Sequence, residues 1–159
     1  MRPDDERIPD SFEIARKMGL SYSFGIANLT SAHPNSVVLE VKGKSGRTLE
    51  VQACSLGGGR IMINRLDGLD VNCSCEIPTL IVHNLDQPGH VAEVTSMLAH
   101  KSVNIANMSL YRDKRGGSAV MVVEMDQPLP KESLEWLEHL EGIVKVTYCL
   151  LYTSDAADD

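Results

Sequence analysis

The chain has 159 residues, 43% of them hydrophobic, which suffices for one ordinary domain or two small ones. A formal net charge of −7 and scattered Lys and Arg residues argue against general nucleic-acid binding, which needs a basic face. No apolar run approaches the roughly 20 residues of a membrane helix, and the polar N-terminus lacks the apolar core of a signal peptide. We therefore expect a cytoplasmic protein that binds neither nucleic acid nor a membrane.

The first half of the chain predicts a short helix followed by a mostly antiparallel sheet. The helix would begin at a capping Asp10 or Ser11 and end at Gly19. Alternating apolar residues predict strands at 20–26, 37–41, 48–53 and 60–66. Because Pro78 marks a plausible boundary, we assign residues 1–77 to a first domain and 78–148 to a second.

In the second domain the predicted order is strand, helix, strand, strand, helix, strand. The strands are expected at 79–84, 103–110, 119–125 and 143–148, and the helices at 90–101 and 130–141. This is the ferredoxin-like βαββαβ arrangement, in which two helices cover one face of a four-stranded sheet, so the fold class is α+β. The other face invites a partner, so we expect a homodimer through this sheet.

Three segments of the second domain resemble the ACT domain. They read LDQPGHV at 85–91, MLA at 97–99 and VNIANM at 103–108. In such domains the turn after the first strand meets the second strand at a dimer interface, and an amino acid binds there. The resemblance therefore implies a ligand-sensing domain.

The first domain is similar to the allosteric-substrate-binding domain that precedes an ACT domain in the β subunit of iron–sulfur L-serine dehydratase. The segments that carry this resemblance are DDERIPDS at 4–11, HPNS at 33–36, GRTLEV at 46–51 and SLGGGRI at 55–61. The family's usual N-terminal stretch with a Ser-Ser-Ser-His-Thr motif is missing, so we expect this domain to be incomplete.

What this resemblance implies is a regulatory β subunit that binds an amino-acid effector, with L-serine expected. The enzyme would convert L-serine to pyruvate and ammonia. The partner would be a catalytic α subunit or domain that carries a 4Fe–4S cluster, whereas this chain would hold no cofactor. Two alternatives stay open: the effector-binding region of a phosphoglycerate dehydrogenase, in which a similar domain occurs, and a free-standing amino-acid-binding module.

The chain itself predicts no catalytic residue and no metal site. There is no Gly-x-Ser-x-Gly elbow and no Cys–His pair in a convincing context. Cys73 and Cys75 lack a second pair of ligands, so we expect reduced thiols. Residues 149–159 resemble a translated sequencing adaptor, and we interpret them as non-native.

The bend after the first strand of the second domain is one candidate ligand site. Asp86 could take a ligand ammonium, Gly89 allows close approach, and N–H groups at a helix start can hold a carboxylate. A plain turn with a capping Asp is the alternative. Asn104, at the start of the second strand, is expected to face the bend, unless it is an edge Asn satisfied by backbone. The remaining candidates here are Pro88, His90 and Ile105.

A second candidate site belongs to the first domain. Three consecutive glycines before Arg60 expose backbone amides and suit a carboxylate or phosphate, although a β-bulge is the alternative. His33 could bind a substrate carboxylate or cation, or be simply exposed. The candidates are His33, Asn35, Ser36, Gly57, Gly58, Gly59 and Arg60.

Overall fold

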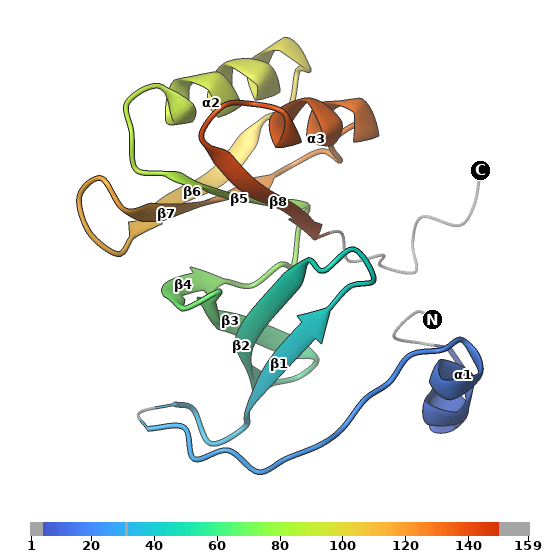
Figure 1. The fold of residues 1–159 in the computed structure, drawn as a ribbon. Helices are drawn as coiled ribbons and strands as arrows, with labels where there is room; N and C mark the ends of the chain where they lie inside the picture. The colour runs from blue at the N-terminus through green and yellow to red at the C-terminus, as the bar shows by residue number, and fades with distance from the viewer. Residues whose placement is uncertain (1–4, 31, 150–159) are drawn as a thin grey trace. The chain divides into compact units, whose positions relative to one another are not determined.

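The computed structural model describes residues 5–30 and 32–149 (Figure 1). These two ranges belong to two separate units and are described in turn. In the first unit, a 3-10 turn at Ile8–Asp10 leads into helix α1, Ser11–Lys17. The predicted helix is therefore confirmed, but among the described residues no side chain caps its first turn. The expected cap by Asp10 or Ser11 is wrong.

The strand predicted at 20–26 is also wrong, because this segment has no regular structure. Its alternation places Tyr22 and Phe24 on the same side, and both rings pack on Phe12 of α1, with centroids 5.1 and 5.5 Å away. Aromatic packing on a helix produces the same two-residue alternation as a strand, so the pattern alone could not separate the two.

The second unit begins with a four-stranded antiparallel sheet, which we call sheet A. Its strands follow the chain order: β1 (Ser36–Lys42), β2 (Thr48–Gly57), β3 (Arg60–Leu66) and β4 (Leu69–Cys73). β4 was not predicted. Asp67 and Gly68, which we expected only to end β3, have φ of +46° and +85° and turn the chain into β4.

One face of sheet A is apolar across all four strands. The register pairs Val37 with Ala53, Ala53 with Ile63, and Ile63 with Cys73, and directly paired residues share a face. The β3 and β4 members of this face are buried, whereas Val37 on β1 is 54% exposed. The sheet therefore buries its apolar face on the side of β3 and β4.

The second sheet, sheet B, has the predicted βαββαβ order. It comprises β5 (Thr79–Leu85), α2 (His90–His100), β6 (Ile105–Arg112), β7 (Ser118–Met125), α3 (Lys131–Glu138) and β8 (Ile143–Cys149). The strand order is β6-β7-β5-β8, every pair is antiparallel, and both helices lie on one face (Figure 1). Their shared core includes Leu80, Val94, Leu98, Met121 and Leu137. The α+β fold class is confirmed.

Sheet A covers the other face of sheet B. Ile81, Val120 and Val122 from sheet B form one core with Ile63 and Leu66 from sheet A. Hence the face that we expected to offer to a second copy is packed within the chain. A homodimer through sheet B would have to use an edge strand, and β6 and β8 are its edges.

Candidate functional site

The bend between β5 and α2 is fixed by Asp86. Its Oδ2 accepts hydrogen bonds from Gly116 N–H at 2.9 Å and from the Arg112 guanidinium at 3.0 Å. These two bonds hold the pKa of the Asp86 carboxyl below its usual range, with the backbone bond the larger cause. Asp86 thus anchors the bend to the β6–β7 hairpin, and the alternative that it caps α2 is wrong.

The start of α2 is uncapped. The N-cap residue is Gly89 with φ +110°, and in the described part of the chain no side chain bonds to the first-turn N–H groups. A Cβ added at Gly89 would meet no described atom within 4 Å, and Pro88 and Gly89 are exposed. Uncapped donors at a helix start with open space before them suit a carboxylate.

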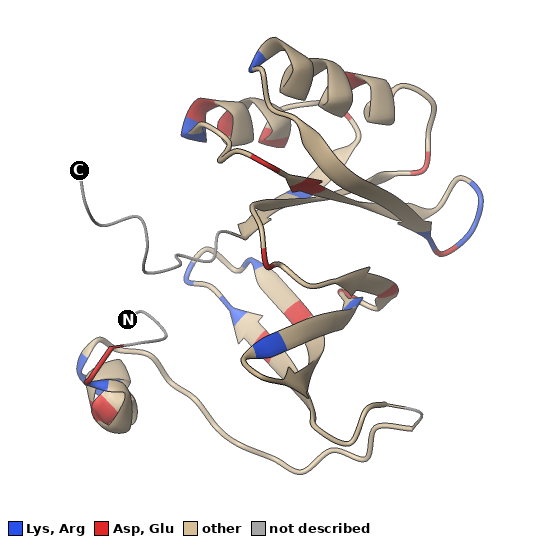
Figure 2. Cartoon of the chain, turned by 180° about the vertical axis from the view of Figure 1, so that it is seen from behind, with Lys and Arg blue, Asp and Glu red and all other residues tan. Residues whose placement is uncertain are grey.

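Positive charge gathers beside this bend. Figure 2 colours the Lys and Arg positions of the β6–β7 hairpin blue, and Arg112, which ends β6 at this hairpin, is bonded to Asp86. Arg115 also acts on the Asp86 carboxyl through its charge. The hairpin therefore adds to the positive end of the α2 dipole.

His90 does not face the open side of the bend. Its side chain is buried and lies against Gly142, where an added Cβ would come within 2.5 Å of the ring. Nδ1 lies 3.3 Å from a Glu93 carboxylate oxygen. Within this chain, His90 is positioned to pack the α3–β8 turn rather than to contact a ligand in the bend.

Asn104 and Ile105 lie at the far end of the sheet from the bend. Ile105 pairs with Met125, the last residue of β7, whereas Leu85 beside the bend pairs with Ser118, the first. The Asn104 side chain donates to Asp126 at 2.5 Å, and its backbone N–H donates to Gln127 at 2.8 Å. The expectation that Asn104 faces the bend is therefore wrong within one chain.

The candidate residues of the first domain come together at one end of sheet A. Asn35 accepts a hydrogen bond from Ser55 N–H at 2.9 Å, and Ser36 pairs with Cys54 near the end of β2. The β2–β3 hairpin is at the same end, because Gly57 pairs with Arg60. The structure thus places His33, Asn35, Ser36, Gly57, Gly58, Gly59 and Arg60 at the same end of sheet A.

The glycines form a two-residue hairpin turn. Gly58 and Gly59 have φ of +63° and +76°, which matches the twist of paired strands. The register also shifts between Ser55 and Gly57, so a bulge precedes the turn. Both features explain the glycines structurally, and the anion role of Arg60 stays a prediction.

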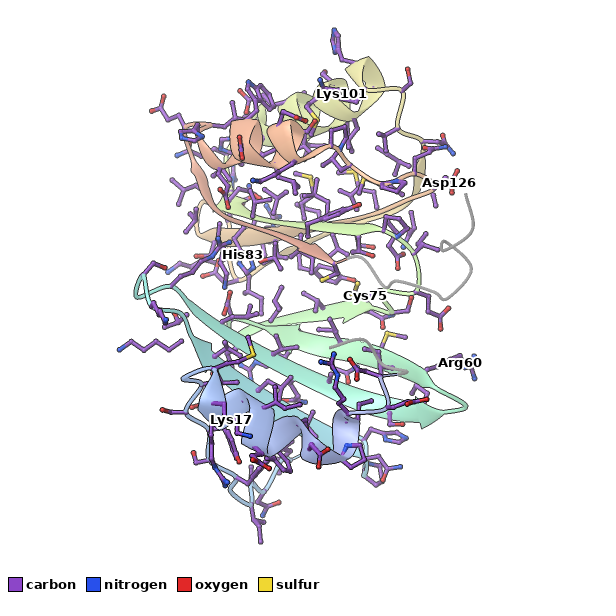
Figure 3. The ribbon with its side chains drawn as sticks, turned by 90° about the vertical axis from the view of Figure 1, so that its right-hand side faces the viewer. Lys17, Arg60, Cys75, His83, Lys101 and Asp126 are labelled. Carbon is purple, nitrogen blue, oxygen red and sulfur yellow. The ribbon has the colours of Figure 1, made fainter. Side chains whose placement is uncertain are left out.

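A partly buried ionic cluster at the junction of the two sheets was missed. Asp67 lies 2.5 Å from Lys145 Nζ and 3.5 Å from His83 Nε2, and Lys145 also donates to the Thr48 carbonyl at 2.8 Å. Figure 3 labels His83, which lies on the face of β5 toward sheet A. The interacting partners are 16, 78 and 97 residues apart in sequence, so no local motif signals the cluster.

Burial and charge oppose each other in this cluster. Burial lowers the pKa of His83, while the Asp67 carboxylate opposes that shift. For Asp67, burial raises the pKa, but hydrogen bonds from Lys145 and from the Glu50 N–H together outweigh it, and the pKa falls below its usual range. The cluster is therefore set up as a neutral histidine beside a carboxylate–ammonium pair.

No described helix is both long enough and apolar enough to cross a membrane. Likewise, the ranges 5–30 and 32–149 contain no group of three or more His, Cys, Asp or Glu side chains arranged to hold a metal ion.

Comparison with known proteins identifies the second domain first. Residues 78–140 match the ACT domain family, and together with the observed topology this makes sheet B and its helices an ACT domain. The chain as a whole is similar to the β chain of L-serine dehydratase. It is 33% identical over 143 residues to the probable β chain from Bacillus subtilis, covering 90% of this chain and 64% of the relative.

Two further relatives are another dehydratase β chain and an enzyme of a different kind. The β chain of L-serine dehydratase from Peptoniphilus asaccharolyticus is 34% identical over 134 residues, which cover 84% of this chain and 60% of the relative. D-3-phosphoglycerate dehydrogenase from Methanocaldococcus jannaschii is 31% identical over 85 residues, 54% of this chain and 16% of the relative. The chain thus spans somewhat under two thirds of the β chains that it matches.

Proposed function

We propose that this chain is the amino-acid-sensing part of an L-serine dehydratase β chain. Similarity to two such β chains over 84% to 90% of the chain supports the assignment, and the ACT domain supports a regulatory role. The complete enzyme converts L-serine to pyruvate and ammonia. Its catalytic partner, an α subunit or domain, carries the 4Fe–4S cluster, and this chain supplies effector binding.

The main support for the proposal is that the start of α2 has no side-chain cap in the described structure and that the space in front of it, at Gly89, is open. A ligand carboxylate accepts hydrogen bonds from the first-turn N–H groups, helped by the basic hairpin. Asp86 uses Oδ2 for both of its internal bonds, which leaves Oδ1 for the ligand ammonium. L-serine, a small zwitterion, fits this arrangement of charges.

Dimerisation through the β6 edge completes this site. Two β6 strands that pair antiparallel across a two-fold axis place the start of each strand beside the end of the other. Asn104 precedes the start of β6, and Arg112, bonded to Asp86, ends it. Asn104 of one copy therefore lies next to the bend of the other, which reconciles its position with a role in ligand binding.

Isothermal titration of the whole chain with L-serine, L-alanine and D-serine tests the binding claim. We expect heat with L-serine and a weaker response to the other two. Gly89→Ala should weaken binding at least about tenfold, equivalent to about 1.4 kcal/mol, because the added methyl occupies the space before the N–H donors. Heat with none of the amino acids contradicts the proposal.

Gly68→Ala is the matched control. Gly68, in the β3–β4 turn, also has a positive φ, +85°, and equally open space in the described structure, so its substitution likewise strains the backbone. Equal weakening by both substitutions would attribute the effect to strain. The dimer is tested by Asn104→Ala, which should weaken binding without changing the monomer fold measured by circular dichroism.

A phosphoglycerate dehydrogenase is the second candidate, supported by similarity to such an enzyme over 85 residues, 54% of this chain. The same bend would then sense the effector of that enzyme. The neighbouring reading frame separates the two: a cysteine-bearing catalytic frame supports the dehydratase, and a glycine-rich dinucleotide motif supports the dehydrogenase.

A further inference from the structure

A pair of buried thiols lies where the chain passes from the last strand of sheet A to the first strand of sheet B. Cys73 ends β4 and Cys75 follows in the connector to β5, and their Sγ atoms are 3.3 Å apart. The two residues are 2% and 4% exposed. Cys75 has φ +54°, a left-handed conformation that is uncommon outside glycine. This local turn folds the connector so that both sulfur atoms meet.

The pair is part of the core between the two sheets. Both cysteines belong to the cluster that contains Ile63 and Val71 of sheet A and Ile81 and Val122 of sheet B. The connector between them is held from outside, since Ser74 Oγ donates to Glu124 at 3.5 Å and accepts from Glu76 N–H at 3.3 Å. Any covalent change at the thiols therefore acts directly on the packing of one sheet against the other.

The two thiols differ in acidity. The hydrogen bond from Cys75 lowers the pKa of Cys73, and hydrogen bonds to Cys149 and Cys73 raise that of Cys75. Of this pair, Cys73 is therefore the thiol that forms a thiolate more readily, and a hydrogen bond with Cys75 also lowers the pKa of Cys149, to about 7. This is the asymmetry of a nucleophilic thiol beside a resolving thiol.

We propose that Cys73 and Cys75 are a reversible disulfide site that responds to peroxides. The Cys73 thiolate attacks one peroxide oxygen and forms a sulfenic acid, while the other oxygen leaves as water after taking up a proton. Cys75 then attacks the Cys73 sulfur, and the sulfenic hydroxyl leaves as a second water with the Cys75 proton. In total, two thiols and one hydrogen peroxide give one disulfide and two waters.

The sulfur atoms need to move only a short distance to form the disulfide, but the peroxide must first reach them. Forming an S–S bond of about 2.05 Å closes the present separation by about 1.3 Å. Both sulfur atoms are covered while the sheets are packed, so a peroxide reaches them only when the junction opens. The reaction therefore links oxidation to the separation of sheet A from sheet B.

The test uses the whole chain with Cys54→Ser and Cys149→Ser, which leaves only this pair of thiols. After hydrogen peroxide treatment under native conditions, we expect a mass loss of about 2 Da, no thiol free to react with iodoacetamide in denaturant, and full recovery with dithiothreitol. Circular dichroism before treatment confirms that the background variant folds.

Adding Cys75→Ser to this background gives the matched control. Cys73 alone should gain oxygen or link two chains, without the mass loss. The same mass change in that control would overturn the proposal. So would two thiols left free after treatment, a disulfide between chains, or sulfinic acid in place of the disulfide. Cys73→Ser in the same background is the second control, because Ser at 73 avoids the left-handed position of Cys75.

Discussion

The Asp86 carboxylate and the Arg112 guanidinium are 3.0 Å apart and join the bend after β5 to the end of β6. The same carboxylate oxygen accepts the Gly116 N–H, so one side chain holds both the bend and the β6–β7 hairpin. The Asp86 side chain therefore adds to the backbone bond from Asp86 N–H to the Gly117 carbonyl, 2.9 Å, in holding the basic hairpin beside the proposed ligand site.

Asp86→Asn should loosen this hairpin. The amide oxygen can still accept one hydrogen bond, but the charge that holds Arg112 is lost. We expect faster hydrogen exchange at the amides of residues 113–117 and weaker L-serine binding. Asp126→Asn, at the far end of the sheet, is the control and should leave this exchange unchanged. Unaltered exchange in Asp86→Asn would show that the hairpin does not depend on the ion pair.

Gly142→Ala should destabilise the ACT domain more than Gly68→Ala does. Both glycines have φ near +80°, so each substitution costs about 1–2 kcal/mol of backbone strain. At Gly142 the added Cβ also meets the buried His90 ring at 2.5 Å, and overpacking adds about 1–3 kcal/mol. Urea denaturation gives both free energies of unfolding, and equal losses would mean that His90 moves aside freely.

The ACT half could be predicted because its signals are local. Helical spacing in 90–101 and the alternating apolar residues of the strands are bounded by glycines and prolines. Each helix and strand of this half corresponds to one predicted element. The bend at Asp86–Gly89 was found for the same reason. The hydrogen bonds that Asp86 accepts could not be predicted, because their donors Arg112 and Gly116 are 26 and 30 residues away in the sequence.

The first half was harder because its pattern is ambiguous. A two-residue turn at Asp67 and Gly68 is long enough to start a new strand, yet the sequence only suggested that β3 ends there. The packing of sheet A on sheet B depends on apolar residues that are common in any protein core, so no sequence motif predicts it. Asn104 was misplaced because the register that sets its distance from the bend emerges only in the folded sheet.

Lys145→Met should weaken the junction of the two sheets. Lys145 neutralises Asp67 and donates to the Thr48 carbonyl, with its side chain only 13% exposed. Removing it leaves the part-buried Asp67 carboxylate beside a neutral histidine, which we expect to cost about 1–3 kcal/mol. Thermal unfolding measures the loss. Lys131→Met, which removes an exposed ion pair within α3, is the control and should change stability little.

His83 should make the stability of the chain depend on mildly acidic pH. Burial lowers its pKa in the folded chain, so the unfolded chain binds a proton first as pH falls below the usual value of about 6.5. The unfolded state then gains stability, and the free energy of unfolding decreases until the folded chain also binds the proton. The charges that face the ring are Asp67, which favours protonation, and Lys145 and Arg47, which oppose it.

His83→Gln should remove this part of the pH dependence. Urea denaturation at about pH 7.5 and about pH 5.5 gives the difference in unfolding free energy for each variant. We expect a smaller difference in His83→Gln than in the parent chain, whereas His100→Gln, at an exposed position of α2, should keep the parent value. If both variants keep the parent difference, His83 is free to take up its proton in the folded chain, and the junction cluster tolerates the charge because Asp67 outweighs the desolvation of the ring.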